Sequence, residues 1–184
     1  SVKRQAVQPH SPPLTDDDLR YRQLARREQP STKAVVFLVL DVSASMGEGS
    51  RKLAKTFFFW AVQGLRRQYR ELDIVFVAHT TQAWEFSEEE FFEVAGSGGT
   101  FMSTAVEKVR SIVDERYSPS QYNAYVFYAS DGENSPSDDA ATRSGLDSLL
   151  DSLRYAGFLE VGSGSGAVPA SDIGRLFLEL ANDG

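Results

Sequence analysis

The sequence predicts a doubly wound α/β fold, with a mainly parallel sheet and helices on both of its faces. Three runs of β-branched and aromatic residues have the unbroken apolar character of strands buried on both faces: 34–41, 73–79 and 123–130. Helical periodicities separate these runs, and this alternation is typical of parallel sheets. Because crossovers between parallel strands are right-handed, the order of elements favours the doubly wound arrangement.

Shorter strands and several helices complete the expected domain. The strands cover 82–86, after a turn, and 158–161; the helices cover 51–70, a segment that starts at Ser87, 103–116 and 139–156. Ser87 precedes three glutamates, which predicts a capped helix start. Spacings of three and four residues in the first helix place Phe57 and Trp60 on the face that packs against the sheet.

The chain divides into a polar arm (1–32), the α/β domain (33–161) and a C-terminal segment (162–184). Prolines punctuate the arm, which is expected to place a short helix around Leu19 to Leu24 against the domain. Residues 162–166 alternate glycine and serine, which fits both a natural loop and an engineered linker. The apolar spacing beyond them predicts a closing helix capped by Ser171.

Composition limits the possible classes of function. The 184 residues include 19 Lys and Arg against 26 Asp and Glu, a formal net charge of −7, so a nucleic-acid partner is not expected. The absence of cysteine excludes disulfides and thiolate metal ligands, and it fits a reducing compartment. No apolar run is long enough to span a bilayer or to act as a signal peptide, so we expect a cytoplasmic protein without membrane contact.

Oxygen-bearing side chains gather where the predicted strands end. Asp41, Ser43 and Ser45 alternate at the end of the first buried strand, Asp131 follows the third, and Thr100 ends a glycine-rich loop. Sites in open α/β sheets form at this carboxyl edge. Carboxylate and hydroxyl oxygens suit Mg²⁺ or Mn²⁺. Taken singly, the hydroxyls also fit helix caps or turns, and the second acid fits an ordinary loop position.

Together, these positions resemble the metal-ion-dependent adhesion site of von Willebrand factor type A domains. The resemblance covers about residues 33–161 and implies that family's Rossmann-like fold. It implies that Ser43, Ser45 and Thr100 supply hydroxyl oxygens, while Asp41 and Asp131 act partly through water. One coordination position would remain for an acidic group of a protein partner.

A narrower resemblance is to the bacterial YeaH/YhbH family of uncharacterised cytoplasmic proteins, associated with stress response or sporulation. The segments that carry it are Lys55–Trp60, Val75–Thr81, Glu88–Glu93, Ser97–Thr100, Glu115–Asn123 and Ser130–Asn134. The resemblance implies a serine protein kinase or a SpoVR-like protein as the partner. Ala44 departs from the family's usual glycine, but it is not a ligand position. The family's proteins are also considerably longer than this chain.

The residues favour a binding module over an enzyme. The chain has no Walker-type phosphate loop and no kinase signature, and its only histidines are His10 and His79. His79 is interpreted as a hydrogen-bonded structural residue, although a position facing the metal edge stays open. Two further alternatives remain: a metal-dependent phosphoesterase that holds Mg²⁺ through Asp41 and Asp131, and a scaffold whose metal site is a relic.

Overall fold

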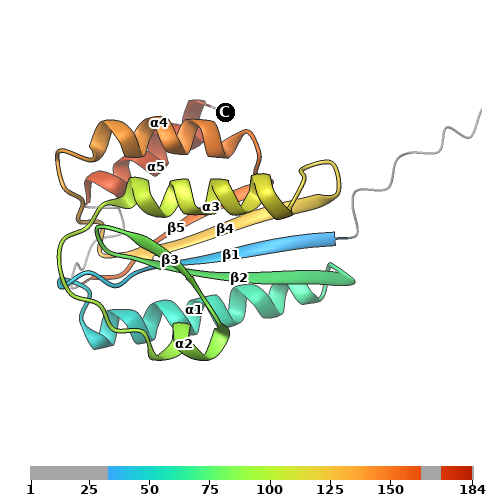
Figure 1. The fold of residues 1–184 in the computed structure, drawn as a ribbon, viewed down its shortest axis with the longest axis horizontal. Helices are drawn as coiled ribbons and strands as arrows, with labels where there is room; N and C mark the ends of the chain where they lie inside the picture. The colour runs from blue at the N-terminus through green and yellow to red at the C-terminus, as the bar shows by residue number, and fades with distance from the viewer. Residues whose placement is uncertain (1–32, 163–170, 184) are drawn as a thin grey trace, which may run out of the picture.

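The computed structural model describes residues 33–162 and 171–183, which form three layers around one central sheet (Figure 1). The strands are β1 (Lys33–Asp41), β2 (Glu71–His79), β3 (Ala83–Phe86), β4 (Tyr122–Ser130) and β5 (Tyr155–Glu160). The helices are α1 (Glu48–Arg66), α2 (Glu88–Glu93), α3 (Met102–Arg116), α4 (Asp139–Leu150) and α5 (Asp172–Asp183). Figure 1 shows α1 and α2 on one face of the sheet and α3, α4 and α5 on the other.

The sheet has the order β3-β2-β1-β4-β5, which confirms the predicted fold class. β1 lies at its centre and runs parallel to β2 and β4; β5 is parallel to β4, and only β3 is antiparallel to its neighbour. In this register Asp41 lies opposite His79, and Leu40 lies opposite Ala129. The carboxyl ends of the three central strands therefore meet at one edge of the sheet.

Alternate residues of β1 enter two separate cores. Val35, Phe37 and Val39 pack into the core on the side of α3, α4 and α5. The intervening residues, among them Val36 and Leu38, pack into the core on the side of α1 and α2. Because helices cover both faces, no position of this strand needs a polar side chain until Asp41.

The prediction that Phe57 and Trp60 face the sheet is right in part for Phe57 and wrong for Trp60. The buried stripe of α1 consists of Ala54, Phe58 and Val62. Phe57 lies at its border, since it is 37% exposed and its ring contacts Phe127 of β4 at a centroid distance of 5.8 Å, whereas Trp60 is 65% exposed. The run from Phe57 to Trp60 supplies an aromatic ring to almost every face of the helix. Helical periodicity identifies residues that share a face, but here it could not select the face that meets the sheet.

Several helix ends agree with the local signals, and others differ. Ser87 and Glu90 form a reciprocal capping box at the start of α2, as the sequence predicted. The Ser171 hydroxyl accepts a hydrogen bond from the Gly174 N–H at 3.0 Å, which confirms it as the cap of α5. α4 ends at Leu150, earlier than predicted, because the chain turns there into β5. The predicted helical arm within 1–32 and most of the 162–166 bridge lie outside the described residues.

Substitution of Phe58 by alanine tests the corrected orientation of α1. The Phe58 ring is fully buried against Phe91, at a centroid distance of 6.1 Å. We expect Phe58→Ala to lower the free energy of unfolding by about 3–5 kcal/mol. The matched control is Phe59→Ala on the exposed side of the helix, which should cost less than about 1 kcal/mol. Urea unfolding measures both, and equal losses would contradict the assignment.

Candidate metal centre

The candidate site lies in the loops at the carboxyl edge of the sheet. The loop after β1 and the loop before Thr100 are joined by a hydrogen bond from the Ala44 N–H to the Gly98 carbonyl, at 3.1 Å. Gly96 lies so close to the loop after β1 that a Cβ atom there would come within 2.1 Å of the Val42 carbonyl oxygen. Only glycine permits this approach, so the sequence itself fixes how near the two loops come.

Asp41 is a fully buried carboxylate whose two oxygens both accept hydrogen bonds. Its Oδ1 accepts from the Ser43 N–H at 2.8 Å, and its Oδ2 accepts from the Ser130 hydroxyl at 2.7 Å. The Ser130 oxygen in turn accepts from the Gly132 N–H at 3.0 Å. A negative charge is thus held behind the loop surface and linked to the end of β4.

The Ser43 and Ser45 side chains bring their hydroxyl oxygens together, with a separation of 3.1 Å. Two oxygens at right angles around a cation, each about 2.1 Å from it, lie about 3.0 Å apart. The spacing therefore fits two ligands of one small hard cation. Capping of α1 does not explain these serines, because the N-cap residue is Gly47 and it makes no side-chain cap bond.

Ser45 and Thr100 line the same open depression, which has a volume of about 540 Å³. The remaining lining residues are Ala44, Gly98, Gly99, Glu133, Asn134 and Ser135. Thr100 does not cap α3, although the sequence allowed that role. The Met102 N–H donates to Asn134 Oδ1 at 3.1 Å, and the Ser103 N–H donates to Asp138 Oδ2 at 3.0 Å. The Thr100 side chain is therefore not needed at the helix start.

Asp131 is the predicted ligand that the structure joins least closely to the others. It follows Ser130 directly and, like Asp41 and Ser43, it is not among the residues that line the depression. Its Oδ1 accepts a hydrogen bond from the Glu133 N–H at 3.1 Å, as in an ordinary Asx turn. The structure therefore brings Asp41, Ser43 and Ser45 into one group and places Ser45 and Thr100 at one depression, whereas Asp131 is linked to Asp41 through its neighbour Ser130.

Asn134 and Asp138 are structural residues of the site that the sequence interpretation missed. Asp138 is buried and also accepts from the Thr142 hydroxyl at 2.8 Å. The Ser135 N–H donates to the Thr100 carbonyl at 3.1 Å, so the same loop holds both Thr100 and the start of α3. Asn and Asp before a helix are a capping signal. That signal did not reveal that these two side chains cap α3, and not the helix that follows them in the chain.

His79 is buried beneath the site as a structural histidine, which confirms the favoured interpretation. Its Nδ1 donates to the Thr80 carbonyl at 3.2 Å, and its Nε2 then accepts from the Tyr128 hydroxyl at 3.0 Å. Burial lowers the pKa of His79, although the nearby Asp41 charge acts in the opposite direction. Burial likewise raises the pKa of Tyr128 well above its usual value. Both rings are therefore neutral at pH 7.

The donor set determines which cation these residues suit. Within residues 33–162 and 171–183, no three His, Cys, Asp or Glu side chains gather as a ligand cluster. A cation at this edge would therefore rely on hydroxyl oxygens, with the buried Asp41 carboxylate supplying charge behind them. Oxygen donors of this kind fit Mg²⁺ or Mn²⁺ and not a softer metal.

Comparison with known proteins places the chain in a family. The profile described as "Protein of unknown function (DUF444)" matches residues 2–179. The chain belongs to the DUF444 family. A UPF0229 protein of Halalkalibacterium halodurans is 40% identical over 163 residues, which cover 88% of this chain and 42% of that relative. A second UPF0229 protein, from Chromohalobacter salexigens, is 45% identical over 145 residues, 78% of this chain and 34% of the relative. This DUF444 chain thus spans well under half the length of these relatives.

Solved structures show that this DUF444 chain has a von Willebrand A-like fold. The manganese-loaded TRAP protein of Plasmodium vivax aligns with a TM-score of 0.56 and 15% identity, covering 79% of this chain and 62% of that one. An aerotolerance-related membrane protein of Bacteroides fragilis aligns with a TM-score of 0.51 and 21% identity, covering 76% and 74%. In the described parts of this chain, none of the helices is both long and apolar enough to cross a membrane.

The buried His79 predicts a dependence of stability on pH. In the unfolded chain the imidazole takes up a proton near its ordinary pKa of about 6.5, whereas burial keeps the folded imidazole neutral to lower pH. The unfolded chain then binds more protons, so the free energy of unfolding falls below pH 6.5, by at most about 1.4 kcal/mol per pH unit. Denaturant unfolding of the metal-free protein between pH 7 and pH 5 should show a steeper loss than the same series for His79→Gln. Parallel curves would contradict a lowered pKa.

Proposed function

We propose that this chain is a metal-ion-dependent protein-binding module. Ser43, Ser45 and Thr100 would hold Mg²⁺ or Mn²⁺, with Asp41 and Asp131 acting partly through water. The observation that carries the proposal is the pair of serine hydroxyls, 3.1 Å apart, together with the buried Asp41 carboxylate that accepts a hydrogen bond from the Ser43 N–H. The Gly98 carbonyl, in the loop before Thr100, and the Ser130 hydroxyl, at the end of β4, hold this arrangement.

The proposed ligand of the cation is a carboxylate of another protein. Bound there, the cation would supply a positive charge that neutral hydroxyl ligands do not cancel, so an incoming Asp or Glu is favoured. The depression beside Ser45 and Thr100 is open to solvent, so a side chain can enter it. The protein carries a net charge of −7, which disfavours an acidic partner wherever no cation compensates. Binding is therefore proposed to depend strictly on metal.

The comparisons support the proposal at the level of the fold. One protein of the same fold is manganese-loaded, and the family itself is described as of unknown function. The narrower resemblance to YeaH/YhbH proteins supports a bacterial stress or sporulation pathway, a cytoplasmic location, and a serine protein kinase or a SpoVR-like protein as partner. All of these remain proposals for this chain and for the longer proteins it resembles.

A binding role is preferred to phosphoester hydrolysis because of the histidine. His79 is buried, and both of its ring nitrogens are engaged by Thr80 and Tyr128. It is therefore poorly placed to activate water at the surface depression. Turnover of a generic phosphoester in Mg²⁺ would favour the enzyme instead, and a complete lack of metal affinity would favour a relic site.

Substitution of Ser45 tests the metal centre with little risk to the fold, since the side chain is exposed. We expect Ser45→Ala to weaken Mn²⁺ binding by at least about tenfold, because one ligand oxygen is lost. Ser120→Ala, an exposed serine outside the depression, is the matched control and should bind Mn²⁺ like the unmodified chain. Isothermal titration calorimetry measures all three. An unchanged affinity in Ser45→Ala would remove this serine from the site.

Substitution of Thr100 tests whether the proposed partner binds through the metal centre. We expect the serine protein kinase or the SpoVR-like protein of the same bacterium to bind the domain in Mg²⁺. Binding should fall by at least about tenfold in chelator and in Thr100→Ala, because each removes the cation or weakens its hold. Surface plasmon resonance with the domain immobilised provides the measurement. Full affinity in both conditions would mean that the partner uses another surface.

A further inference from the structure

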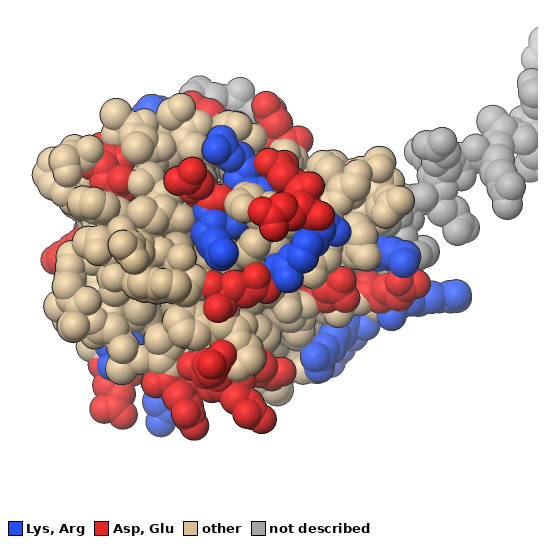
Figure 2. Space-filling model, in the orientation of Figure 1, with Lys and Arg blue, Asp and Glu red and all other residues tan. Residues whose placement is uncertain are grey.

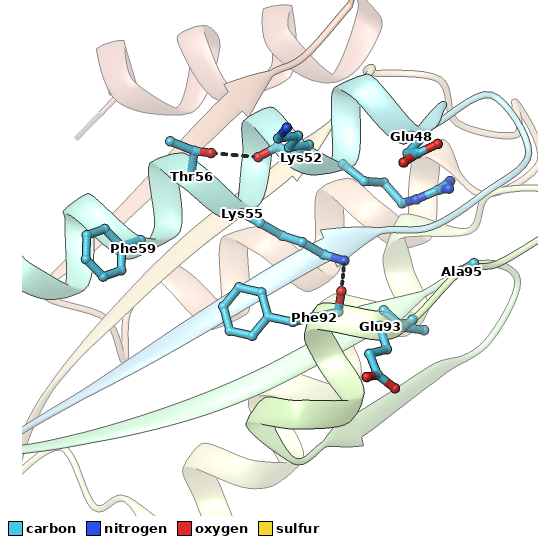
Figure 3. A pocket seen from close by; sticks show the side chains of 10 residues that line it. Glu48, Lys52, Lys55, Thr56, Phe59, Phe92, Glu93 and Ala95 are labelled. Atoms are coloured by element: carbon cyan, nitrogen blue, oxygen red, sulfur yellow. Dashed lines mark hydrogen bonds between the residues drawn. The ribbon is translucent and has the colours of Figure 1, made fainter.

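A second hollow lies between α1 and α2 (Figure 3) and shares no residue with the depression at the metal centre. We call it the α1–α2 groove; it has a volume of about 620 Å³. Its lining residues are Glu48, Arg51, Lys52, Lys55, Thr56, Phe59, Phe92, Glu93, Val94 and Ala95. Figure 3 shows Glu48 and Phe59 at opposite ends of the stretch of α1 that lines it. The proposed function makes no use of this surface.

One end of the α1–α2 groove is cationic. Arg51, Lys52 and Lys55 line it, and none of the three takes part in the ion pairs found among the described residues. The Lys55 Nζ donates to the Phe92 carbonyl at 2.6 Å, across the groove (Figure 3), and Arg51 donates to the Met46 carbonyl. Partial burial and the Arg51 charge lower the pKa of Lys55. The Arg51 and Lys55 charges are therefore held in place by neutral carbonyls.

The other end of the groove is aromatic. Phe59 is 52% exposed and Phe92 is 41% exposed, on opposite walls. Phe92 is anchored by its neighbour Phe91 at a centroid distance of 5.7 Å, and Phe59 by Trp60 at 5.3 Å. These rings are about half uncovered, which is typical of surfaces that receive an apolar group.

We propose that the α1–α2 groove binds an extended acidic segment of a protein partner that also carries a large apolar side chain. The carboxylates would pair with Lys52, Lys55 and Arg51, and the apolar side chain would lie between Phe59 and Phe92. Arg51 and Phe59 lie eight positions apart on α1, which is about 12 Å along the helix. An extended peptide covers that length in about four residues. The apolar residue should therefore lie about four positions from the acidic ones.

Charge and shape distinguish this ligand from other anionic surfaces. Glu48 and Glu93 line the same groove and would repel the continuous negative charge of a nucleic acid. A hollow between two helices admits a single chain, whereas a lipid bilayer presents a flat face. A short segment with localised carboxylates satisfies both constraints.

Fluorescence anisotropy of a labelled synthetic peptide tests the proposal. The probe has three consecutive glutamates and a phenylalanine four positions after the last of them. We expect saturable binding that is unchanged by chelator, since no predicted metal ligand lines the groove. Lys52→Glu should weaken binding by at least about tenfold and Phe59→Ala by at least about threefold. Arg110→Glu, an exposed position on α3, makes a matched charge change away from the groove and should have no effect.

Several outcomes would overturn the proposal. The first is a lack of saturable peptide binding. The second is that Arg110→Glu weakens peptide binding as much as Lys52→Glu does. The third is that a triglutamate peptide without phenylalanine competes as well as the full peptide. Anionic phospholipid vesicles that bind through Lys52 while the peptide does not would identify a membrane surface instead. Sedimentation that detects dimers abolished by Lys52→Glu would identify a second copy of the chain as the occupant. Circular dichroism confirms that each variant is folded, and the chelator arm separates failure here from failure of the metal centre.

Discussion

A buried carboxylate at the end of the central strand organises the loops of this protein. Removing Asp41 from water is costly unless its oxygens are hydrogen-bonded, and donors from two separate segments meet that need. Ser130 then orients Gly132, which has a φ of +85° and where a Cβ atom would come within 2.1 Å of the Ser171 hydroxyl. Ser171 begins α5. The end of β1 and the end of β4 are thus connected through one charge, and Gly132 lies close against Ser171 at the start of the last helix.

The loop after β4 serves the site in a different way. Asn134 and Asp138 satisfy the first free N–H groups of α3, which would otherwise need a cap from their own loop. This leaves the Thr100 hydroxyl available to a cation, while the Ser135 N–H holds the Thr100 carbonyl. The proposed site therefore depends on residues that touch no metal, which is the usual support of a ligand set.

Electrostatics gives the two hollows related roles. The charged side chains in Figure 2 are of both signs on the visible face, and the chain as a whole is acidic. An acidic partner is therefore attracted only where a positive charge is concentrated. At the proposed metal centre a cation would supply it, and in the α1–α2 groove Arg51, Lys52 and Lys55 supply it. Metal dependence distinguishes the two sites even if one partner were to contact both.

The sequence by itself determined the features that depend on neighbours along the chain. Unbroken apolar runs identified the buried strands, Ser87 identified the start of α2, and the oxygen-bearing residues were found at the carboxyl edge, because each signal spans only a few residues. Tertiary structure alone decided that Phe58 is fully buried while Trp60 is exposed, since aromatic residues occur on several faces of α1. It also decided that Asp131 accepts a hydrogen bond from the Glu133 N–H and that Asp138 caps a neighbouring helix. These outcomes depend on strand register and on contacts between residues distant in sequence, and no local pattern encodes them.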